Sequence, residues 1–519
     1  MWNTRTPHAH DLTAGADGPG RRTARAIVVA TCLSLAAVVA VAAAGCAVNP
    51  VTHRPELAMV SRSTELELGS EQAKSVAAGM GLLDDAAIAA YVRAIGARLA
   101  ARSPRADVPY AFHVVDTPEP NAFAIPGHVY VTRGLLVLLN EEDELAGVLA
   151  HEVGHIAARH AVQRLSRALP AGIVTGIVSG VTGLASPLLG SLFQAGGDFA
   201  TDALLAPYSR DQEREADRVG QEMAARSGWD PVALAHALAT LERFEATETK
   251  SKRRPSFLDS HPSTPERAHN TAAYAATLVR VSAAPIVPTR GEFLARLDGL
   301  VVGLSAAQGV FDGKKFLHPD LGFHLRFPTE WKTANAATQV AGMAGDGRTI
   351  AVLSLAAEGN DPMLGVRAFE RSVEEPVAPR VERTTINGLP AAHLGATTQA
   401  EGRRIAIEIW WMALGDHVYQ LTGLGAGPSP DDDRAILAGI ADSFGALTQT
   451  ERAGIREDHL RLVQPKPGET LAVFTNRTGT PWSSAMVAIA NGLATGTLPS
   501  PLRPLKVAVR EPYEGKPPL

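Results

Sequence analysis

Apolar and polar positions follow patterns along this chain that predict both helices and strands. Residues 141–150 are charged at their start and apolar at their end, which predicts a helix whose second half is buried. Residues 208–220 are dense in charge and predict a second, acidic helix. Residues 320–331 and 404–425 alternate apolar with polar side chains, which is typical of strands. A helical region is therefore expected to precede a region rich in strands.

The uncharged segment 168–197 lies between the two predicted helices. Gly172, Gly176 and Gly180 recur every four residues, a spacing that lets one helix approach another backbone closely. A membrane-spanning helix is one interpretation, but the many glycines and Pro187 argue against it. We expect an apolar hairpin or flap beside the cleft that the two helices form.

Composition places the chain among globular proteins. It has 519 residues, a net charge of −5 and 20% charged residues, and it has no basic block, so a nucleic-acid partner is not expected. A chain of this length is expected to fold into more than one domain.

The stretch 151-HEVGHIAARH-160 carries the candidate chemistry. His151 and His155 lie four residues apart, so on a helix both imidazoles face the same side and can reach one tetrahedral zinc ion. Glu152 then lies about 100° further around the helix, where it can act on an activated water without being a ligand. This is the H-E-x-x-H arrangement of zinc proteases, although a five-residue match can also arise by chance in a long chain.

A third ligand has to come from another segment. The metzincin pattern H-E-x-x-H-x-x-G-x-x-H would need glycine at position 158 and histidine at 161, and both positions hold alanine. His160 is one residue out of register, and we expect a plain histidine on the helix surface. The acidic helix at 208–220 is the best source, since Glu213 and Asp217 share one face four residues apart.

At these residues the chain resembles the gluzincin metallopeptidases that include the heat-shock protease HtpX, the CAAX prenyl proteases and the periplasmic lipoproteins of BepA type. In that family a helix with the pattern E-x-x-A-D follows the H-E-x-x-H helix, and Glu213, Ala216 and Asp217 match it. The resemblance implies that Glu213 is the third zinc ligand and that Asp217 orients a ligand histidine. Glu215 is the rival, but it points to a different face from Asp217.

Two further segments match the same family. Residues 121–136 resemble the strand that precedes its catalytic helix, so Asn121, Phe123 and Ala124 are candidates for pairing with an extended substrate backbone. Residues 259–270 resemble its S-H-P loop, in which the histidine lies near the metal. His261 could therefore stabilise the oxyanion or occupy the open zinc position and keep the enzyme latent; an ordinary turn is the third interpretation.

The N-terminus resembles a bacterial lipoprotein signal. Three arginines between positions 21 and 25 precede the uncharged segment 26–46, which ends in Ala-Ala-Gly-Cys like a lipobox. Cys46 is then the lipidated first residue of the mature chain, and Ala47 after it hints at the outer membrane. An uncleaved transmembrane anchor is the alternative, but 46-CAVNPVTHRPEL-57 looks like the mature start of lipoprotein members of the family.

The region after residue 281 shows no second catalytic set. Residues 320–331 resemble the start of small α/β domains of PsbP or Mog type, which mostly bind partners. Residues 460–479, with the strand-like 505–509, resemble a degraded LysM module, but glutamate replaces aspartate at position 469 and the segment is short. A plain end-cap is the alternative to peptidoglycan binding.

Together these observations predict an α+β multidomain protein. A mainly α-helical gluzincin domain with a small active-site sheet precedes a small α/β domain and a short LysM-like module. The expected divisions are a signal peptide at 1–45, a zinc metallopeptidase domain at 46–280, a linker at 281–310, a PsbP/Mog-like domain at 311–450 and a LysM-like module at 455–511.

The predicted function is that of a zinc endopeptidase tethered by lipid to the outer membrane and facing the periplasm. His151, His155 and Glu213 would hold one Zn²⁺, and Glu152 would be the general base. The resemblance implies misfolded or stalled envelope proteins as substrates, with an outer-membrane protein or peptidoglycan as a further partner. The rival is a non-catalytic periplasmic chaperone or cell-wall-binding scaffold, which would have no chemical need for Glu152.

Overall fold

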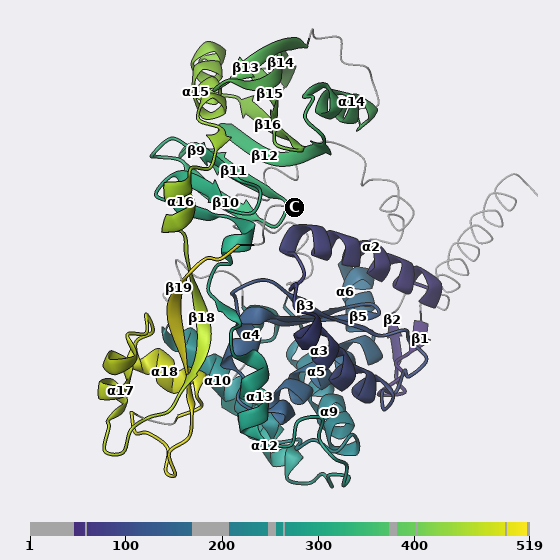
Figure 1. Cartoon of the computed structure of the whole chain (residues 1–519). Helices are drawn as coiled ribbons and strands as arrows, with labels where there is room; N and C mark the ends of the chain where they lie inside the picture. Colours follow the sequence, from purple (N-terminus) through teal and green to yellow (C-terminus); the bar gives the residue numbers. More distant parts are fainter. Residues whose placement is uncertain are drawn as a thin grey trace, which may run out of the picture.

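A computed structural model describes residues 46–57, 60–168, 207–247, 256–262, 265–372, 381–400, 403–493 and 496–515. Within these ranges the chain has helices throughout and five separate sheets. Figure 1 shows a mainly helical lower body and a strand-rich upper body. The predicted α+β class is confirmed at this level, and the detailed domain division stays a prediction.

The lower body is built from helices around a small sheet. The sheet has the order β3-β5-β4, with β3 (Ala111–Val115) parallel to β5 (His128–Thr132) and β4 (Ala122–Ile125) antiparallel to it at one edge. The helices of this body are α2 (Arg62–Met80), α3 (Ala86–Ala100), α4 (Arg133–Leu138), α5 (Glu142–Ala157), α6 (His160–Ala168), α9 (Arg210–Arg226), α10 (Ala233–Thr247), α11 (Phe257–Ser260), α12 (Pro265–Ala275) and α13 (Arg290–Leu297).

Helix α5 begins in a buried network around Glu142. The carboxylate of Glu142 accepts hydrogen bonds from Tyr91 Oη at 2.9 Å and Trp229 Nε1 at 2.7 Å. It also accepts from the backbone N–H groups of Ile286 at 2.8 Å and Val287 at 2.6 Å. A carboxylate in the first turn complements the helix dipole. The start of α5 is thereby fixed to α3, to the loop before α10 and to the segment before α13.

The first described residues form a small hairpin against the lower body. β1 (Cys46–Val48) pairs antiparallel with β2 (Pro55–Leu57). We call residues 46–57 the N-terminal clasp. The clasp packs against α6, because β2 contacts that helix.

The upper body contains a fully antiparallel sheet with the order β10-β11-β12-β16-β15-β14-β13. Its strands are β10 (Lys332–Ala336), β11 (Gln339–Met343), β12 (Thr349–Glu358), β13 (Glu382–Ile386), β14 (Leu389–Ala400), β15 (Arg403–Leu414) and β16 (His417–Gly425), and α14 (Met363–Ser372) and α15 (Pro430–Asp442) pack on it.

A four-stranded sheet with the order β17-β9-β8-β7 completes this body. Its strands are β7 (Val310–Asp312), β8 (Lys315–His318), β9 (Phe323–Arg326) and β17 (Gly445–Ala446). The strands predicted within 320–331 and 404–425 correspond to β9 and to β15 with β16, and are confirmed.

The C-terminal residues return to the lower body. β18 (Arg456–Val463) pairs antiparallel with β19 (Leu505–Pro512), and β6 (Val301–Val302) lies on the other side of β18. Helices α17 (Leu471–Thr478) and α18 (Ser484–Ala490) lie between these strands in the chain. Lys506 is fully buried, and its Nζ donates to the carbonyl oxygens of Val137 at 2.7 Å and Leu139 at 2.6 Å, at the end of α4.

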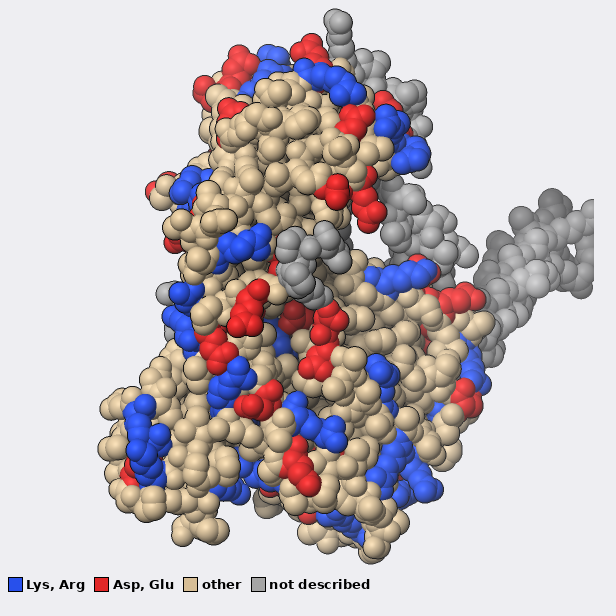
Figure 2. Space-filling view, in the orientation of Figure 1, with Lys and Arg blue, Asp and Glu red and all other residues tan. Residues whose placement is uncertain are grey.

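Two sequence predictions fall outside the described residues: the signal peptide at 1–45 and nearly all of the apolar segment 168–197. Among the helices that are described, none combines the length and the apolar character needed to cross a bilayer. On the face shown in Figure 2, acidic and basic side chains of the described chain are interspersed, with no continuous basic surface. This agrees with the absence of a basic block in the sequence.

Candidate metal centre

Helix α5 carries His151, Glu152 and His155 into the interior, where the three side chains are almost completely buried. Helix α9 crosses α5 at very short range because two glycines face the crossing. A Cβ atom on Gly220 would lie 2.8 Å from the backbone nitrogen of His151, and one on Gly154 would lie 3.0 Å from the carbonyl oxygen of Ala216. The close approach brings Glu213, on the first turns of α9, to the histidines of α5.

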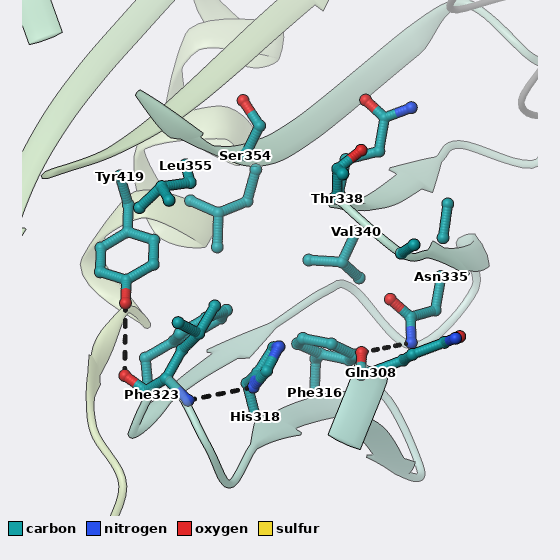
Figure 3. Close-up of a pocket in the computed structure, with 15 residues that line it drawn as sticks. Gln308, Phe316, His318, Phe323, Asn335, Thr338, Val340, Ser354, Leu355 and Tyr419 are labelled. Carbon is teal, nitrogen blue, oxygen red and sulfur yellow. Dashed lines mark hydrogen bonds between the residues drawn. The ribbon is translucent and has the colours of Figure 1, made fainter. Parts of the chain in front are cut away.

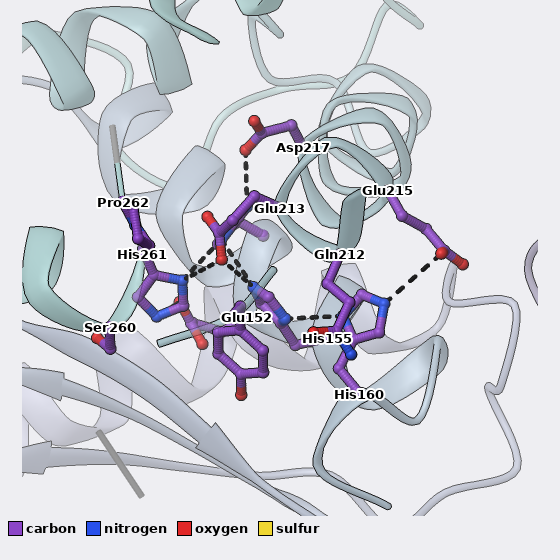
Figure 4. A network of polar contacts seen from close by, with 12 residues as sticks. Glu152, His155, His160, Gln212, Glu213, Glu215, Asp217, Ser260, His261 and Pro262 are labelled. Atoms are coloured by element: carbon purple, nitrogen blue, oxygen red, sulfur yellow. Dashed lines mark hydrogen bonds and ion pairs between the residues drawn. The ribbon is translucent and has the colours of Figure 1, made fainter. Parts of the chain in front are cut away.

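Four donor atoms meet at this crossing (Figure 4). His151 Nε2 lies 3.0 Å from His155 Nε2 and 3.2 Å from His261 Nδ1. Glu213 Oε1 lies 3.0 Å from His261 Nδ1 and 3.4 Å from His155 Nε2. Ligands about 2.0–2.1 Å from a tetrahedral zinc ion are separated from one another by roughly 3.3 Å. Three histidines and one carboxylate at this spacing fit zinc.

The charges of two of the four donors, His155 and Glu213, suit a divalent cation. Burial lowers the pKa of His155 well below its usual value, which keeps its imidazole neutral as a metal ligand must be. Burial raises the pKa of Glu213, but His261, His155 and Arg267 outweigh that effect and hold it well below the usual value. An ionised carboxylate and a neutral imidazole are the donor forms that zinc binds.

Glu152 lies beside the four donors without joining them. Its Oε1 is 3.5 Å from His261 Nε2, and within the described part of the chain neither carboxylate oxygen accepts a hydrogen bond. Burial raises the pKa of this carboxyl group. Because burial disfavours the charged form, this carboxyl group can hold a proton at a pH where an exposed glutamate would be ionised.

Asp217 lies one turn after Glu213, as its predicted role requires. Its Oδ1 is 2.9 Å from His151 Nδ1, the ring nitrogen that faces away from the donor cluster. Arg267 holds the same carboxylate with two hydrogen bonds of 2.8 Å and also lies 2.6 Å from Glu213 Oε2. Arg267 was missed in the sequence analysis. It lies six residues after His261, but nothing in its local sequence indicates a contact with Asp217, 50 residues away on α9.

The sequence predicted that His160 lies on the surface of a helix, and this prediction is wrong. Its side chain is fully buried, and its Nδ1 lies 2.8 Å from His155 Nδ1. The single-helix assumption caused the error, because α5 ends at Ala157 and Arg159 has a left-handed φ of 58°. The chain therefore turns before α6 starts at His160, and that residue faces back toward His155.

The predicted substrate strand is β4, which lies at the edge of its sheet among the described strands. Phe123 and Ala124 belong to β4, and Asn121 directly precedes it. All three side chains are buried. Strand β4 contacts α5, so an edge strand of the described sheet lies next to the helix that carries two residues of the donor cluster.

Comparison with known proteins identifies this region. The model of peptidase family M48 matches residues 86–275, which include the whole donor cluster. This part of the chain is a peptidase family M48 domain. The predicted relationship is confirmed, and the residues of the cluster fit the zinc ion that such metallopeptidases use.

Curated relatives resemble the chain mainly over the M48 domain. Mitochondrial metalloendopeptidase OMA1 of Schizosaccharomyces pombe is 32% identical over 42% of this chain and 63% of its own length. The beta-barrel assembly-enhancing protease of Escherichia coli is 28% identical over 39% of this chain and 42% of its own length. The chain thus spans between about two fifths and three fifths of these relatives.

A solved structure, cyanobacterial PsbP from Synechocystis, covers 28% of the chain at 12% identity with a TM-score of 0.21. A likeness this weak supports no statement about the upper body.

Proposed function

We propose that this protein is a zinc metalloendopeptidase of the cell envelope. One observation carries the proposal: His151, His155 and Glu213 offer three donors at tetrahedral spacing, and Glu152, on the helix of the two histidines, lies beside them and accepts no hydrogen bond from the described residues. A chaperone or scaffold would need neither the donors nor a buried carboxylate that accepts no hydrogen bond from the described residues.

Each residue of the site has a separate task. His151, His155 and Glu213 would hold one Zn²⁺, which supplies a Lewis acid that polarises a carbonyl group and makes water more acidic. Glu152 takes the proton of the attacking water and passes it to the leaving amine of the scissile bond. Asp217 holds His151 and Arg267 holds Glu213, and these contacts maintain the spacing of the donors.

His261 is the fourth donor of the cluster, because its Nδ1 lies within 3.2 Å of both His151 Nε2 and Glu213 Oε1. In this position it fills the place that a substrate carbonyl needs, which favours the latent role over the oxyanion role. Movement of the short loop at Ser260–Pro262 would then open the site.

Substrate would bind as an extended strand along the outer edge of β4, with Asn121, Phe123 and Ala124 at the contact. Backbone pairing selects for unfolded segments rather than for a sequence, which suits misfolded or stalled envelope proteins. The names of the bacterial relatives support this substrate class. Membrane attachment would come from a lipid on Cys46, with the outer membrane as the location.

The C-terminal residues 455–511 have the order strand, helix, helix, strand, with the two strands paired antiparallel. This supports a LysM-like module and peptidoglycan as a partner, alongside an outer-membrane protein. The upper body would bind a protein partner, as its predicted resemblance to PsbP or Mog domains suggests.

The deciding experiment is Glu152→Gln. We expect one zinc per chain, an unchanged melting temperature and a fall in the cleavage of an unfolded protein by roughly 10²–10⁴-fold, because the general base is lost while all ligands remain. The matched control is Glu141→Gln, the same substitution at the exposed start of the same helix. Undiminished cleavage by the Glu152 variant would contradict the proposed mechanism.

A further inference from the structure

Asn49, in the N-terminal clasp, is almost completely buried although it belongs to a surface hairpin. Its Nδ2 donates to Glu56 and, at 2.9 Å, to Glu215 Oε1 on α9. Its Oδ1 accepts from the backbone N–H groups of Val51 at 2.7 Å and Thr52 at 3.1 Å. Both polar atoms of the Asn49 amide form hydrogen bonds, so the orientation of the amide is fixed.

Glu215 lies between Asn49 and the donor cluster. Its Oε2 lies 3.6 Å from His160 Nε2, just beyond hydrogen-bond length, and His160 Nδ1 lies 2.8 Å from His155 Nδ1. His155 presents its other nitrogen, Nε2, to the cluster. With a metal on its Nε2, His155 carries its proton on Nδ1 and donates it to His160 Nδ1. The proton of His160 then lies on Nε2, which faces Glu215. Figure 4 shows these three side chains in a row.

A second set of hydrogen bonds connects the clasp to α9. Gln163 Nε2 on α6 donates to Glu56 Oε2 at 2.6 Å, and Gln212 Nε2 donates to Gln163 Oε1 at 3.0 Å. Gln212 caps the start of α9 and directly precedes Glu213. The clasp is thus connected to both protein elements that supply ligands.

We propose that Asn49, Glu215 and His160 are positioning residues that hold the zinc ligand His155, so that the N-terminal clasp is part of the metal centre. The inference rests on the proposed zinc site and assigns a role to residues that the ligand set does not include. A ligand histidine whose far nitrogen is held keeps its tautomer and ring orientation, and the loss of such a partner typically lowers metal affinity by about 10–100-fold. The hairpin that follows the predicted lipidation site would then control how tightly zinc is held.

The test uses the full-length protein in detergent, and it needs no substrate. Zinc affinity is measured by competition with a chelator, and the visible spectrum of the cobalt-substituted protein reports the ligand geometry. We expect Asn49→Ala to weaken zinc binding by about tenfold or more and to alter the cobalt spectrum. The matched control, Thr52→Ala in the same turn, leaves the Asn49–Glu215 contact in place and should bind zinc like the wild type.

Glu215→Gln provides an independent variant if Asn49→Ala does not fold, because it keeps the shape of the side chain and removes only the charge facing His160. Weaker zinc binding in this variant would support the inference. The contact would be purely structural if both zinc affinity and the cobalt spectrum were unchanged and only the melting temperature of the metal-free protein fell. That result would overturn the inference. A wild-type protein that binds no zinc would instead overturn the proposed function itself, and this inference with it.

A separate observation concerns the upper body, where a cavity of about 360 Å³ opens between its two sheets (Figure 3). Phe316, His318 and Phe323 form its floor, and the exposed Leu355 lies at its wall. No acidic side chain, lysine or arginine is among the described residues that line it. Leu321 N donates to His318 Nδ1 at 3.2 Å, so the proton of a neutral His318 lies on Nε2, which points into the cavity.

We infer that this cavity binds a small uncharged organic molecule with an apolar body and a hydrogen-bond acceptor. The volume lies in the range of small-molecule sites, and the apolar walls favour an uncharged ligand. Burial lowers the pKa of His318 to about 4, so its ring is a neutral donor at pH 7. Gln308, which also lines the cavity, donates to Asp116 of the lower body, so an occupant would touch the junction of the two bodies.

The probe is the neutral fluorescent ketone 6-propionyl-2-(dimethylamino)naphthalene, compared with the anion 1-anilinonaphthalene-8-sulfonate. We expect saturable binding of one ketone per chain, weaker binding of the anion, and a loss of about tenfold or more when Leu355→Trp narrows the cavity at its exposed wall. His318→Phe should weaken ketone binding because it removes the donor. Equal binding of the anion, binding without saturation, or binding that persists in Leu355→Trp would each overturn the inference.

Discussion

Gly220→Ala is the sharpest test of how the fold builds the metal centre. The added Cβ would lie 2.8 Å from His151 N and 2.9 Å from His151 Cα, and both neighbours are backbone atoms that cannot rotate away. Carbon atoms in ordinary contact are separated by about 3.5 Å, so α9 has to retreat from α5 by roughly 0.6 Å. Glu213 moves with α9, whereas His151 and His155 stay on α5.

The expected loss of zinc affinity follows from how little the zinc–ligand distances can change. Zinc–ligand distances vary by only about 0.2 Å, so a retreat of roughly 0.6 Å cannot be absorbed by the metal. Overpacking of this kind typically costs about 1–3 kcal/mol. The metal-free protein can relax by separating the helices and the zinc-bound form cannot, so the cost falls on metal binding and lowers zinc affinity by roughly 5–150-fold.

The assay is chelator competition for zinc, with the melting temperature measured with and without zinc. The control is Gly439→Ala on α15, where the new methyl group meets nothing within 4 Å and the helix gains a better helix former. That variant should bind zinc normally and should be as stable as the wild type or slightly more stable. Normal zinc affinity in Gly220→Ala would refute the claim that close helix packing sets the spacing of the donors.

Three further predictions concern individual side chains. Glu213→Ala should abolish stoichiometric zinc binding measured by elemental analysis, whereas Glu215→Ala should keep the stoichiometry with a lower affinity; the opposite order would place the wrong glutamate in the ligand set. His261→Ala should raise proteolysis at matched zinc occupancy if it removes a latent ligand, and a fall of about 10²-fold would point to the oxyanion role. Cys46→Ser should abolish labelling by a radioactive fatty acid and leave an unprocessed precursor, and a variant that is still labelled and cleaved would exclude the lipoprotein interpretation.

The sequence predicted the parts of the site that depend on local geometry. His151, Glu152 and His155 belong to one helix, so their relative placement follows from helical spacing alone. Glu213 and Asp217 were found by spacing together with family resemblance, and the structure places both at the donor cluster. The strands at β9, β15 and β16 followed from simple alternation of apolar and polar positions.

The parts that were missed depend on contacts between distant segments. His160 was misplaced because two residues at Ala158 and Arg159 end one helix and start another, and periodicity cannot detect such a break. Arg267 and Asn49 contact the site from segments about 50 and 166 residues away from their partners on α9. Nothing in the local sequence of either residue indicates its partner.

The buried contact of Lys506 with the end of α4 has a consequence for how the protein is made. Ribosomes produce a chain from its N-terminus, and Lys506 follows Leu139 by 367 residues. The carbonyl groups of Val137 and Leu139, just before the helix that carries His151 and His155, therefore lack their Lys506 partner until residue 506 has been synthesised. The setting of that helix would then be completed only after the strand-rich upper body, which lies between the two segments in the chain, has also been made.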